Sequence, residues 1–326
     1  MKNILVIGGA GYVGSVLVPK LIEKGYLVTV FDLFIYGKDT LDENKNLKLV
    51  NGDIRDIESI KKYVESADAI IHLACISNDP SFELNPKLGK SINLDSFEPL
   101  VKLSSKLNVK RFIYASSSSV YGIKEEKNVD EKLSLEPLTD YSKFKVQCEK
   151  ILQSYTSEKF ETVIVRPATV CGYSRRQRLD VVVNILTNLA INKRKIKVLG
   201  GDQLRPNIHI NDMANIYIKL LEAKKEIVNG EIFNAGYDNF TVKQIALTVK
   251  EVIGKDIEIV TEETNDNRSY HISSNKIYNK LNFTPKYTIK NAINDLKIAF
   301  ELNKLPNSLS ESKYFNIKKM QEIDLV

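Results

Sequence analysis

The first half of the chain alternates short apolar runs with longer stretches in which apolar side chains recur every three or four positions. Apolar runs of four or five residues between turn signals are typical of buried strands, whereas the longer periodic stretches are typical of amphipathic helices. The runs predict strands at Ile4–Ile7, Leu27–Phe31, Leu47–Val50, Ala69–Leu73, Arg111–Ala115 and Thr162–Val165. Helices are expected between them at Tyr12–Lys24, Ile57–Glu65, Leu88–Leu107 and Asp140–Tyr155.

This alternation predicts a parallel sheet with helices on both faces, because two parallel strands need a crossover that a helix supplies. Such crossovers are right-handed, so we expect an α/β fold built on a doubly wound parallel sheet. Residues 1–170 are expected to form this part, which a later strand near residues 231–235 rejoins. Residues 171–302 are expected to form a smaller mixed α/β lobe, interleaved with the first part, and residues 303–326 a tail of unassigned order. Further helices are expected at Leu179–Ile191, Asp212–Leu221, Thr241–Val252 and Ile289–Leu302, and further strands at Ile196–Leu199 and Ile232–Asn234.

Three glycines, Gly8, Gly11 and Gly14, lie between the first expected strand and the first expected helix. A tight turn at this point needs positive φ, and a dinucleotide pyrophosphate can approach the backbone only where no Cβ intervenes. The helix that follows offers unpaired N–H groups to phosphates, so Tyr12 and Val13 belong to the same predicted site. Because the glycines stand in a strand–turn–helix unit, they predict a dinucleotide-binding loop.

Asp32 closes the second expected strand, eighteen residues after Gly14. A carboxylate at this place can accept both ribose hydroxyls of NAD and repels a 2′-phosphate. Its sequence neighbours Phe31, Leu33 and Phe34 include no arginine, so the pattern favours NAD over NADP as the cofactor. Asp53, with Ile54, follows the third strand and is expected either to hold the adenine edge or only to cap a turn.

The spacing Tyr-x-x-x-Lys occurs three times, at Tyr141/Lys145, Tyr155/Lys159 and Tyr314/Lys318. The first pair alone follows a buried strand that ends in a serine run, residues 116–119, and the carboxyl ends of parallel strands are where ligands bind. We therefore predict Tyr141 as the acid–base group, with Lys145 one helical turn further and Ser117 hydrogen-bonded to the same substrate oxygen. The lysine and a cationic NAD⁺ are expected to lower the pKa of Tyr141, since a free phenol has a pKa of about 10.

Composition narrows the class of protein. The 326 residues are 43% apolar and 27% charged, which is typical of a soluble, folded protein, and no apolar run approaches the length of a membrane span. Three cysteines without Cys-x-x-Cys spacing and only three histidines predict neither a disulfide framework nor a bound metal. A net charge of +6 is too diffuse to indicate nucleic-acid binding. We expect a cytoplasmic protein that acts on a small anionic molecule.

Several motifs in order resemble the extended short-chain dehydrogenases, in particular the NAD-dependent nucleotide-sugar epimerases and dehydratases such as UDP-glucose 4-epimerase. These motifs are GGAGYVG at 8–14, Asp32, GDI at 52–54, HLA at 72–74, Asn93, SSSSVYG at 116–122, YSKFK at 141–145, RPATVCG at 166–172 and RPNIHINDMA at 205–214. The resemblance covers residues 2 to 300 and implies a Rossmann-type sheet, an NAD cofactor and a nucleotide-sugar substrate. It also implies a homodimer, in which the helices near Leu94–Leu107 and Ser142–Tyr155 pair across a twofold axis.

The same resemblance assigns further roles to single residues. It makes Ser117 the catalytic hydroxyl, Asn93 a support of the catalytic network, and Arg205 and Arg268 the groups that bind the substrate diphosphate. Thr169 stands where many relatives have asparagine, so its nucleotide contact is in question. The remaining residues expected to contact cofactor or substrate are Leu73, Ala74, Pro167, Ser118 and Arg178.

Two departures from the family pattern narrow the reaction. Dehydratases of this family place Asp-Glu directly after the catalytic hydroxyl residue, whereas Ser118 and Ser119 stand here and serve poorly as acid and base. We therefore predict a nucleotide-sugar 4-epimerase or 4-oxidoreductase, with a role in making surface-polysaccharide precursors. The alternatives are a 4,6-dehydratase-like enzyme and a non-catalytic NAD-sensing protein on the same fold. The basic segment 173–180, which includes Arg178, is either a ligand grip or a solvated loop.

Overall fold

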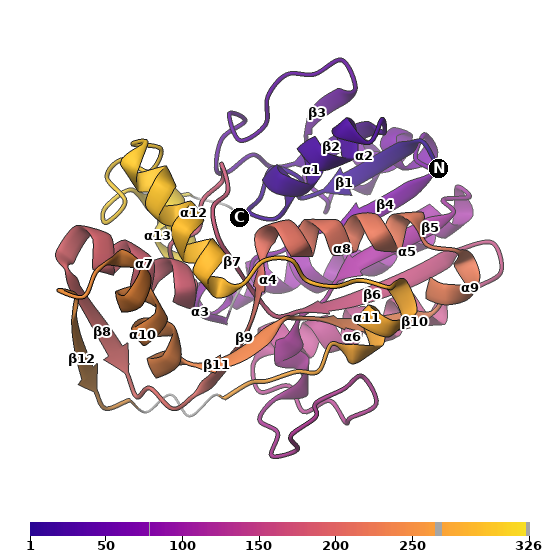
Figure 1. The fold of residues 1–326 in the computed structure, drawn as a ribbon. Coiled ribbons are helices and arrows are strands. Elements are labelled where there is room, and N and C mark those ends of the chain that lie inside the picture. The colour runs from indigo at the N-terminus through magenta and orange to yellow at the C-terminus, as the bar shows by residue number, and fades with distance from the viewer. Residues whose placement is uncertain (78, 265–268, 324–326) are drawn as a thin grey trace.

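The computed structural model describes residues 1–77, 79–264 and 269–323, and its central feature is a parallel sheet of seven strands (Figure 1). The spatial order is β10-β6-β5-β4-β1-β2-β3, and every neighbouring pair is parallel. The strands are β1 (Asn3–Ile7), β2 (Leu27–Asp32), β3 (Leu47–Asn51), β4 (Ala69–His72), β5 (Arg111–Ala115), β6 (Glu161–Pro167) and β10 (Glu231–Ala235). The predicted doubly wound parallel sheet is confirmed.

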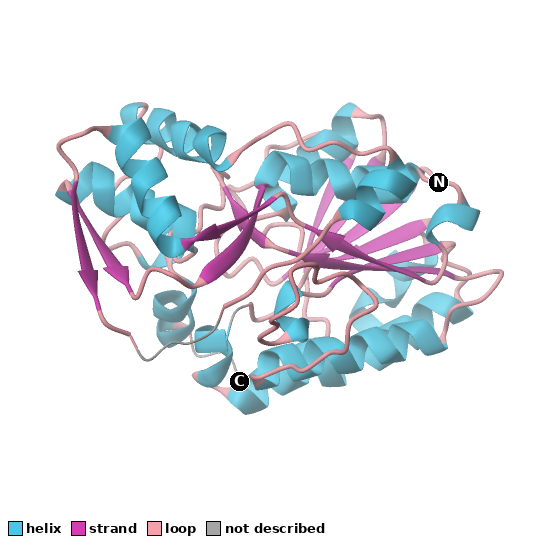
Figure 2. Ribbon diagram, turned by 60° about the horizontal axis from the view of Figure 1, so that its bottom comes forward, coloured by secondary structure: helices cyan, strands magenta, loops and turns pink. Residues whose placement is uncertain are grey.

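Helices cover both faces of this sheet (Figure 2). One face packs against α1 (Gly14–Glu23) and α8 (Ile210–Glu222), and the other against α2 (Ile57–Glu65), α5 (Phe97–Lys106) and α6 (Asp140–Ser154). Because both faces are covered, β1, β4 and β5 are apolar and buried almost throughout, which explains why they read as continuous apolar runs.

The helix expected at Leu88–Leu107 is interrupted in the structure. It consists of α4 (Pro86–Lys90), a π-helical turn η1 (Ser91–Asp95) and α5, and it follows the short helix α3 (Asp79–Glu83). Single π-helical turns inside α-helices are frequent at functional sites. Here the turn carries Asn93, whose side chain accepts from the backbone N–H of Ile76 at 2.8 Å and donates to its carbonyl at 2.9 Å.

The smaller part holds a three-stranded sheet, β11-β9-β7, and a two-stranded sheet, β12-β8. Its strands are β7 (Thr169–Cys171), β8 (Lys195–Leu199), β9 (Leu204–His209), β11 (Asp238–Thr241) and β12 (Glu258–Glu262). Its helices are α7 (Val182–Lys193), α9 (Lys225–Val228), α10 (Val242–Ile253), α11 (Asn275–Leu281) and α12 (Ile289–Glu301). Helices α7, α10 and α12 surround a separate apolar core that includes Val183, Ile245 and Ile293.

The segment after Leu302 is built into the molecule. It forms a 3-10 turn, η3 (Ser312–Tyr314), and a last helix, α13 (Asn316–Glu322). Leu305 and Tyr314 are buried against Leu179 and Leu296 of the smaller part. Helix α13 lies where the two parts meet, because Asn316 is hydrogen-bonded to Ser77 after β4 and to Arg176 of the smaller part (Figure 1). The apolar residues of this segment do not recur at a helical or strand period, because a few separate contacts hold it in place.

The expected dimer helices show why the apolar pattern alone does not define an interface. Phe97, Leu100 and Val101 are fully buried in the protein's own core. The exposed positions of α5 include Glu98 and Lys102, so its outer face is polar. The homodimer therefore remains a prediction. Among the described residues, no helix has the length and apolar character that a bilayer crossing requires.

A buried histidine below the sheet edge predicts how stability depends on pH. His72 ends β4 between the rings of Phe97 and Tyr114, at centroid distances of 5.6 and 5.8 Å. Burial, with a smaller contribution from the Lys145 ammonium, lowers the pKa of His72 to about 3. Because an unfolded histidine has a pKa of about 6.5, only the unfolded chain takes up this proton as the pH falls below that value.

This histidine therefore stabilises the fold fully above pH 6.5, and its contribution is lost at up to about 1.4 kcal/mol per pH unit as the pH falls towards 3. Urea unfolding from pH 7 to 4 should show a steeper loss of stability in the wild type than in His72→Phe. Equal slopes for the two proteins would show that His72 is protonated in the folded state.

Candidate active site

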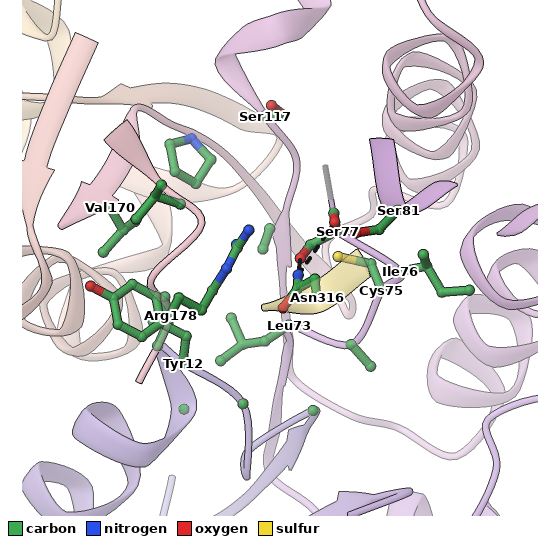
Figure 3. Close-up of a pocket in the computed structure, with 18 of the residues that line it drawn as sticks. Tyr12, Leu73, Cys75, Ile76, Ser77, Ser81, Ser117, Val170, Arg178 and Asn316 are labelled. Carbon is green, nitrogen blue, oxygen red and sulfur yellow. Dashed lines mark hydrogen bonds between the residues drawn. The ribbon is translucent and has the colours of Figure 1, made fainter. Parts of the chain in front are cut away.

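A cleft of about 550 Å³ opens at the carboxyl ends of β1, β2, β4, β5 and β6, where the smaller part faces the sheet (Figure 3). Most of the residues predicted from the sequence line it: Gly8, Gly11, Tyr12, Val13, Gly14, Asp32, Ile54, Leu73, Ala74, Ser117, Ser118, Tyr141, Pro167, Thr169, Arg178 and Arg205. Asp53, Asn93 and Lys145 lie outside the lining, and Arg268 lies outside the described residues.

The glycine-rich loop leaves no room for side chains. Gly8 has φ +81°, and a Cβ on it would lie 2.5 Å from the backbone nitrogen of Ala74. A Cβ on Gly14 would lie 2.3 Å from the carbonyl oxygen of Gly9. The strand, the loop and the first turn of α1 can therefore approach one another only with glycine at these places. No side chain caps α1, so its N-terminus is suited to the phosphates of a dinucleotide.

Asp32 is held at the mouth of this loop. Its carboxylate accepts from the backbone N–H of Ala10 at 2.9 Å and from that of Phe34 at 2.8 Å. Burial raises the pKa of Asp32, while these two N–H groups and the Arg176 guanidinium oppose the rise. The sequence showed no arginine beside Asp32, whereas the fold brings Arg176 into its electrostatic range. Asp53 instead accepts from the guanidinium of Arg55 at 2.7 Å.

The predicted acid–base group stands where β5 ends and α6 begins. Ser117 follows β5, and Tyr141 lies in the first turn of α6, whose N-terminus is closed by a capping box of Thr139 and Ser142. Ser117 and Tyr141 are hydrogen-bonded through their side chains. The Nζ of Lys145 donates to the carbonyl of Ala115 at 2.7 Å and lies 5.7 Å from the centre of the Tyr141 ring.

In the protein alone, burial opposes the lowering of the phenol pKa that lysine and NAD⁺ are expected to cause. Burial, together with Cys75 and Asp79, raises the pKa of Tyr141 well above its ordinary value. Arg178 and the Ser117 hydrogen bond oppose this rise without cancelling it. Desolvation outweighs nearby positive charge here, because a buried phenolate loses its water shell. The phenol is therefore protonated in the protein alone at neutral pH.

Behind Ser117 and Tyr141 lies a buried ion pair that the sequence reasoning missed. Glu149 and Arg166 are only 2% and 3% exposed at their side chains, and Arg166 donates to both carboxylate oxygens, at 3.0 and 2.6 Å. Ser116 donates to Glu149 at 2.5 Å, and Arg166 donates to the Tyr121 hydroxyl at 2.8 Å. The network ties β5, α6 and β6 together directly behind Ser117. The signal was present, since Glu149 lies one turn beyond Lys145 on the same helix face.

Asn93 does not line the cleft but is hydrogen-bonded to a residue that does. Its two hydrogen bonds to Ile76 fix the segment after β4, which lines the cleft through Cys75, Ile76 and Ser77. The backbone carbonyl of Asn93 also accepts from Cys148 of α6. It therefore holds the cleft wall and α6 together, and its predicted contact with the substrate stays a prediction.

The basic segment 173–180 divides into exposed and buried residues. Arg175 is exposed and pairs with Asp42, as expected of a solvated loop. Arg176 and Arg178 instead line the cleft. The Nε of Arg178 donates to the carboxylate of Asp180 at 2.9 Å. The Arg178 side chain extends from the Tyr12 side towards the centre of the pocket (Figure 3). Its buried Nη2 has no hydrogen-bond partner among the described residues, which suits an anionic ligand.

The far end of the cleft is formed by the smaller part. Thr169 of β7 and Arg205 of β9 line it, and the Arg205 guanidinium lies 5.7 Å from the ring centre of Tyr270. Arg176 and Arg178 have buried guanidinium nitrogens without a hydrogen-bond partner among the described residues. Together with the glycine cradle and the Ser117–Tyr141 pair, these two arginines fit a dinucleotide beside a second anionic molecule. Among the described residues, no cluster of three potential metal ligands occurs.

Comparisons with known proteins agree with this arrangement. The chain is 28% identical over 319 residues to human dTDP-D-glucose 4,6-dehydratase, an alignment that covers 90% of this chain and 88% of the relative. It is 27% identical over 277 residues to UDP-glucose 4-epimerase of Lactobacillus helveticus, covering 78% and 83%. The crystal structure of UDP-glucose 4-epimerase from Thermotoga maritima with UDP-glucose superposes with a TM-score of 0.84 at 26% identity, covering 92% of this chain and 99% of that one.

The chain also matches a model of a protein family. The model described as the NAD dependent epimerase/dehydratase family matches residues 4–236, which include the glycine-rich loop, the serine run, Tyr141 and Lys145. The match covers more than half of the chain. The chain therefore belongs to the NAD dependent epimerase/dehydratase family, and its cofactor is NAD.

Proposed function

We propose that this protein is an NAD-dependent nucleotide-sugar 4-epimerase or 4-oxidoreductase that uses Ser117, Tyr141 and Lys145. The observation that carries the proposal is which residues surround the hydroxyl of Ser117. Ser117 and Tyr141 meet in the cleft, and the two positions after Ser117 are Ser118 and Ser119, which also line it. A serine hydroxyl has too high a pKa to protonate a leaving hydroxyl or to take a carbon-bound proton at neutral pH.

The carboxylates that line the described part of the cleft are already engaged. Asp32 is bonded to the backbone of Ala10 and Phe34 at the loop mouth. Asp180 is paired with Arg178, and Asp79 accepts from the hydroxyl of Thr139 at the start of α6. Elimination of water needs both an acid and a base at the sugar, so these engagements favour chemistry limited to hydride and proton transfer.

The protein's part in this chemistry is proton transfer at one sugar hydroxyl. The Oη of Tyr141 takes the hydroxyl proton, and the hydroxyl of Ser117 donates a hydrogen bond to the oxygen that is left. Lys145 holds the Ala115 carbonyl and supplies positive charge within 5.7 Å of the phenol ring. NAD⁺, when bound, supplies the hydride acceptor and a further positive charge that favours the phenolate. Burial raises the pKa of Tyr141 in the protein alone, and the charge of NAD⁺ opposes this rise.

Arg205 and Arg178 are proposed to bind the diphosphate and sugar hydroxyls of the substrate. Arg205→Ala is expected to raise KM by about 10-fold or more with a smaller change in kcat, because a guanidinium–phosphate contact is lost in ground and transition states alike. Steady-state kinetics on the accepted nucleotide sugar measure this. Arg194→Ala, an exposed arginine paired with Asp256, is the matched control. An unchanged KM for the Arg205 variant would remove it from the diphosphate site.

Asp32 is proposed to select the cofactor. NADP⁺ should bind on the order of 100-fold more weakly than NAD⁺, because the 2′-phosphate would meet the carboxylate at the loop mouth. Fluorescence titration of both cofactors measures the ratio of the two affinities. Asp32→Asn should narrow this ratio, because it weakens the bonds to the ribose hydroxyls of NAD⁺ and removes the charge that repels the 2′-phosphate of NADP⁺. Equal affinities in the wild type would contradict this assignment.

The function itself is tested with purified protein and a panel of UDP-, GDP-, dTDP- and CDP-sugars. Inversion at one sugar carbon without net NADH release indicates a 4-epimerase, and stoichiometric NADH indicates a 4-oxidoreductase. A product lighter by one water would instead identify a dehydratase, and no conversion with tight NAD binding would favour an NAD-sensing protein. Precursors of surface polysaccharides are the proposed substrates.

A further inference from the structure

A chain of side chains crosses the cofactor end of the cleft. The Asn316 amide at the start of α13 donates to the hydroxyl of Ser77 at 2.8 Å, a bond drawn in Figure 3. Its oxygen accepts from Arg176 at 2.6 Å and from the hydroxyl of Tyr36 at 3.1 Å. The Arg176 guanidinium also stacks on the Tyr36 ring, 3.5 Å from its centre. All four residues line the cleft.

The position of this bridge follows from the order of the strands. Ser77 lies after β4 and Tyr36 after β2, and β1, which carries the glycine-rich loop, lies between these two strands in the sheet. The bridge therefore spans the strand whose loop is suited to a pyrophosphate. Arg176 is anchored beside that loop, because its backbone N–H reaches the hydroxyl of Ser15 in α1 at 3.5 Å. The neighbouring Ser174 hydroxyl donates to the carbonyl of Tyr12 at 2.9 Å.

Arg176 has donors without a protein partner. The residue is only 5% exposed, and its Nε and Nη1 atoms are buried with no hydrogen-bond partner among the described residues. No carboxylate of the described residues forms an ion pair with it, although Asp32 and Asp180 lie within electrostatic range. Buried donors of native proteins are almost always satisfied, so a cleft-lining guanidinium with two buried, unpartnered nitrogens indicates an anionic ligand.

We propose that Arg176 binds the pyrophosphate of NAD, held in place by the bridge Tyr36–Arg176–Asn316–Ser77, and that this bridge must open for the dinucleotide to leave. The inference rests on the placement of NAD in this cleft. A planar guanidinium that is stacked on a ring and held at one nitrogen is preorganised, and its two remaining nitrogens match two phosphate oxygens. Asn316 is then a positioning residue contributed by the C-terminal segment.

The test compares Arg176→Met with the control Arg175→Met. The control removes the same charge from the preceding residue, whose side chain is exposed and paired with Asp42. Affinities for NAD⁺, ADP and adenosine are measured by calorimetry. Arg176→Met should weaken NAD⁺ and ADP alike by about 10- to 100-fold, as for loss of a charge-assisted hydrogen bond, and leave adenosine unchanged. Arg175→Met should leave all three affinities unchanged. Asn316→Ala should increase the rate at which bound NAD dissociates in a stopped-flow competition.

Two results would overturn the inference: unchanged ADP affinity in Arg176→Met, or equal weakening of ADP and adenosine. Should Arg176→Met fail to fold, Asn316→Ala decides, because an unchanged dissociation rate would exclude the bridge. Asp32→Asn separates this inference from the placement of the cofactor. If Asp32→Asn weakens NAD⁺ while Arg176→Met does not, Arg176 alone is misassigned. If neither weakens it, the dinucleotide lies elsewhere.

Discussion

Tyr141→Phe is expected to lower turnover by roughly 10²- to 10⁴-fold, the range that general acid–base groups contribute. The substitution removes the phenol hydroxyl that is hydrogen-bonded to Ser117 at the strand end and leaves the ring in place. NAD⁺ affinity should remain nearly unchanged, because the glycine-rich loop and Asp32 are untouched. Steady-state rates on the accepted nucleotide sugar, together with an NAD⁺ titration, measure the two effects separately.

The chain supplies its own control for this experiment. Tyr155 has the same spacing to a lysine, but it ends α6 away from the cleft and its hydroxyl donates to Glu98 at 3.3 Å. Tyr155→Phe should therefore turn over at the wild-type rate. Activity of Tyr141→Phe within a few-fold of wild type would show that another group moves the proton.

Arg166→Leu is expected to destabilise the fold by about 3–5 kcal/mol, because it leaves the Glu149 carboxylate buried without its partner. Among the described residues, Glu149 would keep the hydrogen bond from the Ser116 hydroxyl alone, which cannot replace two charge-assisted bonds. Urea unfolding followed by circular dichroism measures the loss. The double variant Arg166→Leu/Glu149→Leu should recover much of it, since an apolar pair removes the uncompensated charge.

An exposed ion pair again provides the comparison. Arg194→Leu breaks a pair with Asp256 in which both side chains are about half exposed or more, and it should change stability by less than about 1 kcal/mol. A loss of similar size in Arg166→Leu would mean that the pair behind Ser117 contributes no more than a surface contact.

The parallel sheet could be predicted because each strand carries its own signal. β1, β4 and β5 are buried on both faces and therefore appear as uninterrupted apolar runs. The strands β9 and β11 could not be predicted, since they contain Pro206, Asp238 and Asn239, which are poor strand formers, and owe their pairing to each other. The break of the expected helix at Leu88–Leu107 was equally hidden, because the π-helical turn depends on the contact between Asn93 and Ile76.

The candidate site likewise contains residues that the sequence predicts and residues that it does not. The glycine loop, Asp32 and the Ser117–Tyr141 pair follow from local patterns at strand ends, where position along the chain fixes position in the fold. Arg176, Asn316 and the sign of the Tyr141 pKa shift depend on distant segments and on burial. Sequence spacing carries no measure of desolvation, so it could not show that burial raises the pKa of Tyr141 in the protein alone.

The most direct test of the proposed reaction uses a nucleotide sugar that carries deuterium at C4, chosen from the substrates the panel identifies. After turnover, the position of the label is read by NMR and mass spectrometry. Hydride and proton transfer at one carbon predicts deuterium retained at C4 with inverted configuration, or deuterium in released NADH. Deuterium at C6 of a product that has lost water would contradict the account, because it requires the acid and base that Ser118 and Ser119 do not supply.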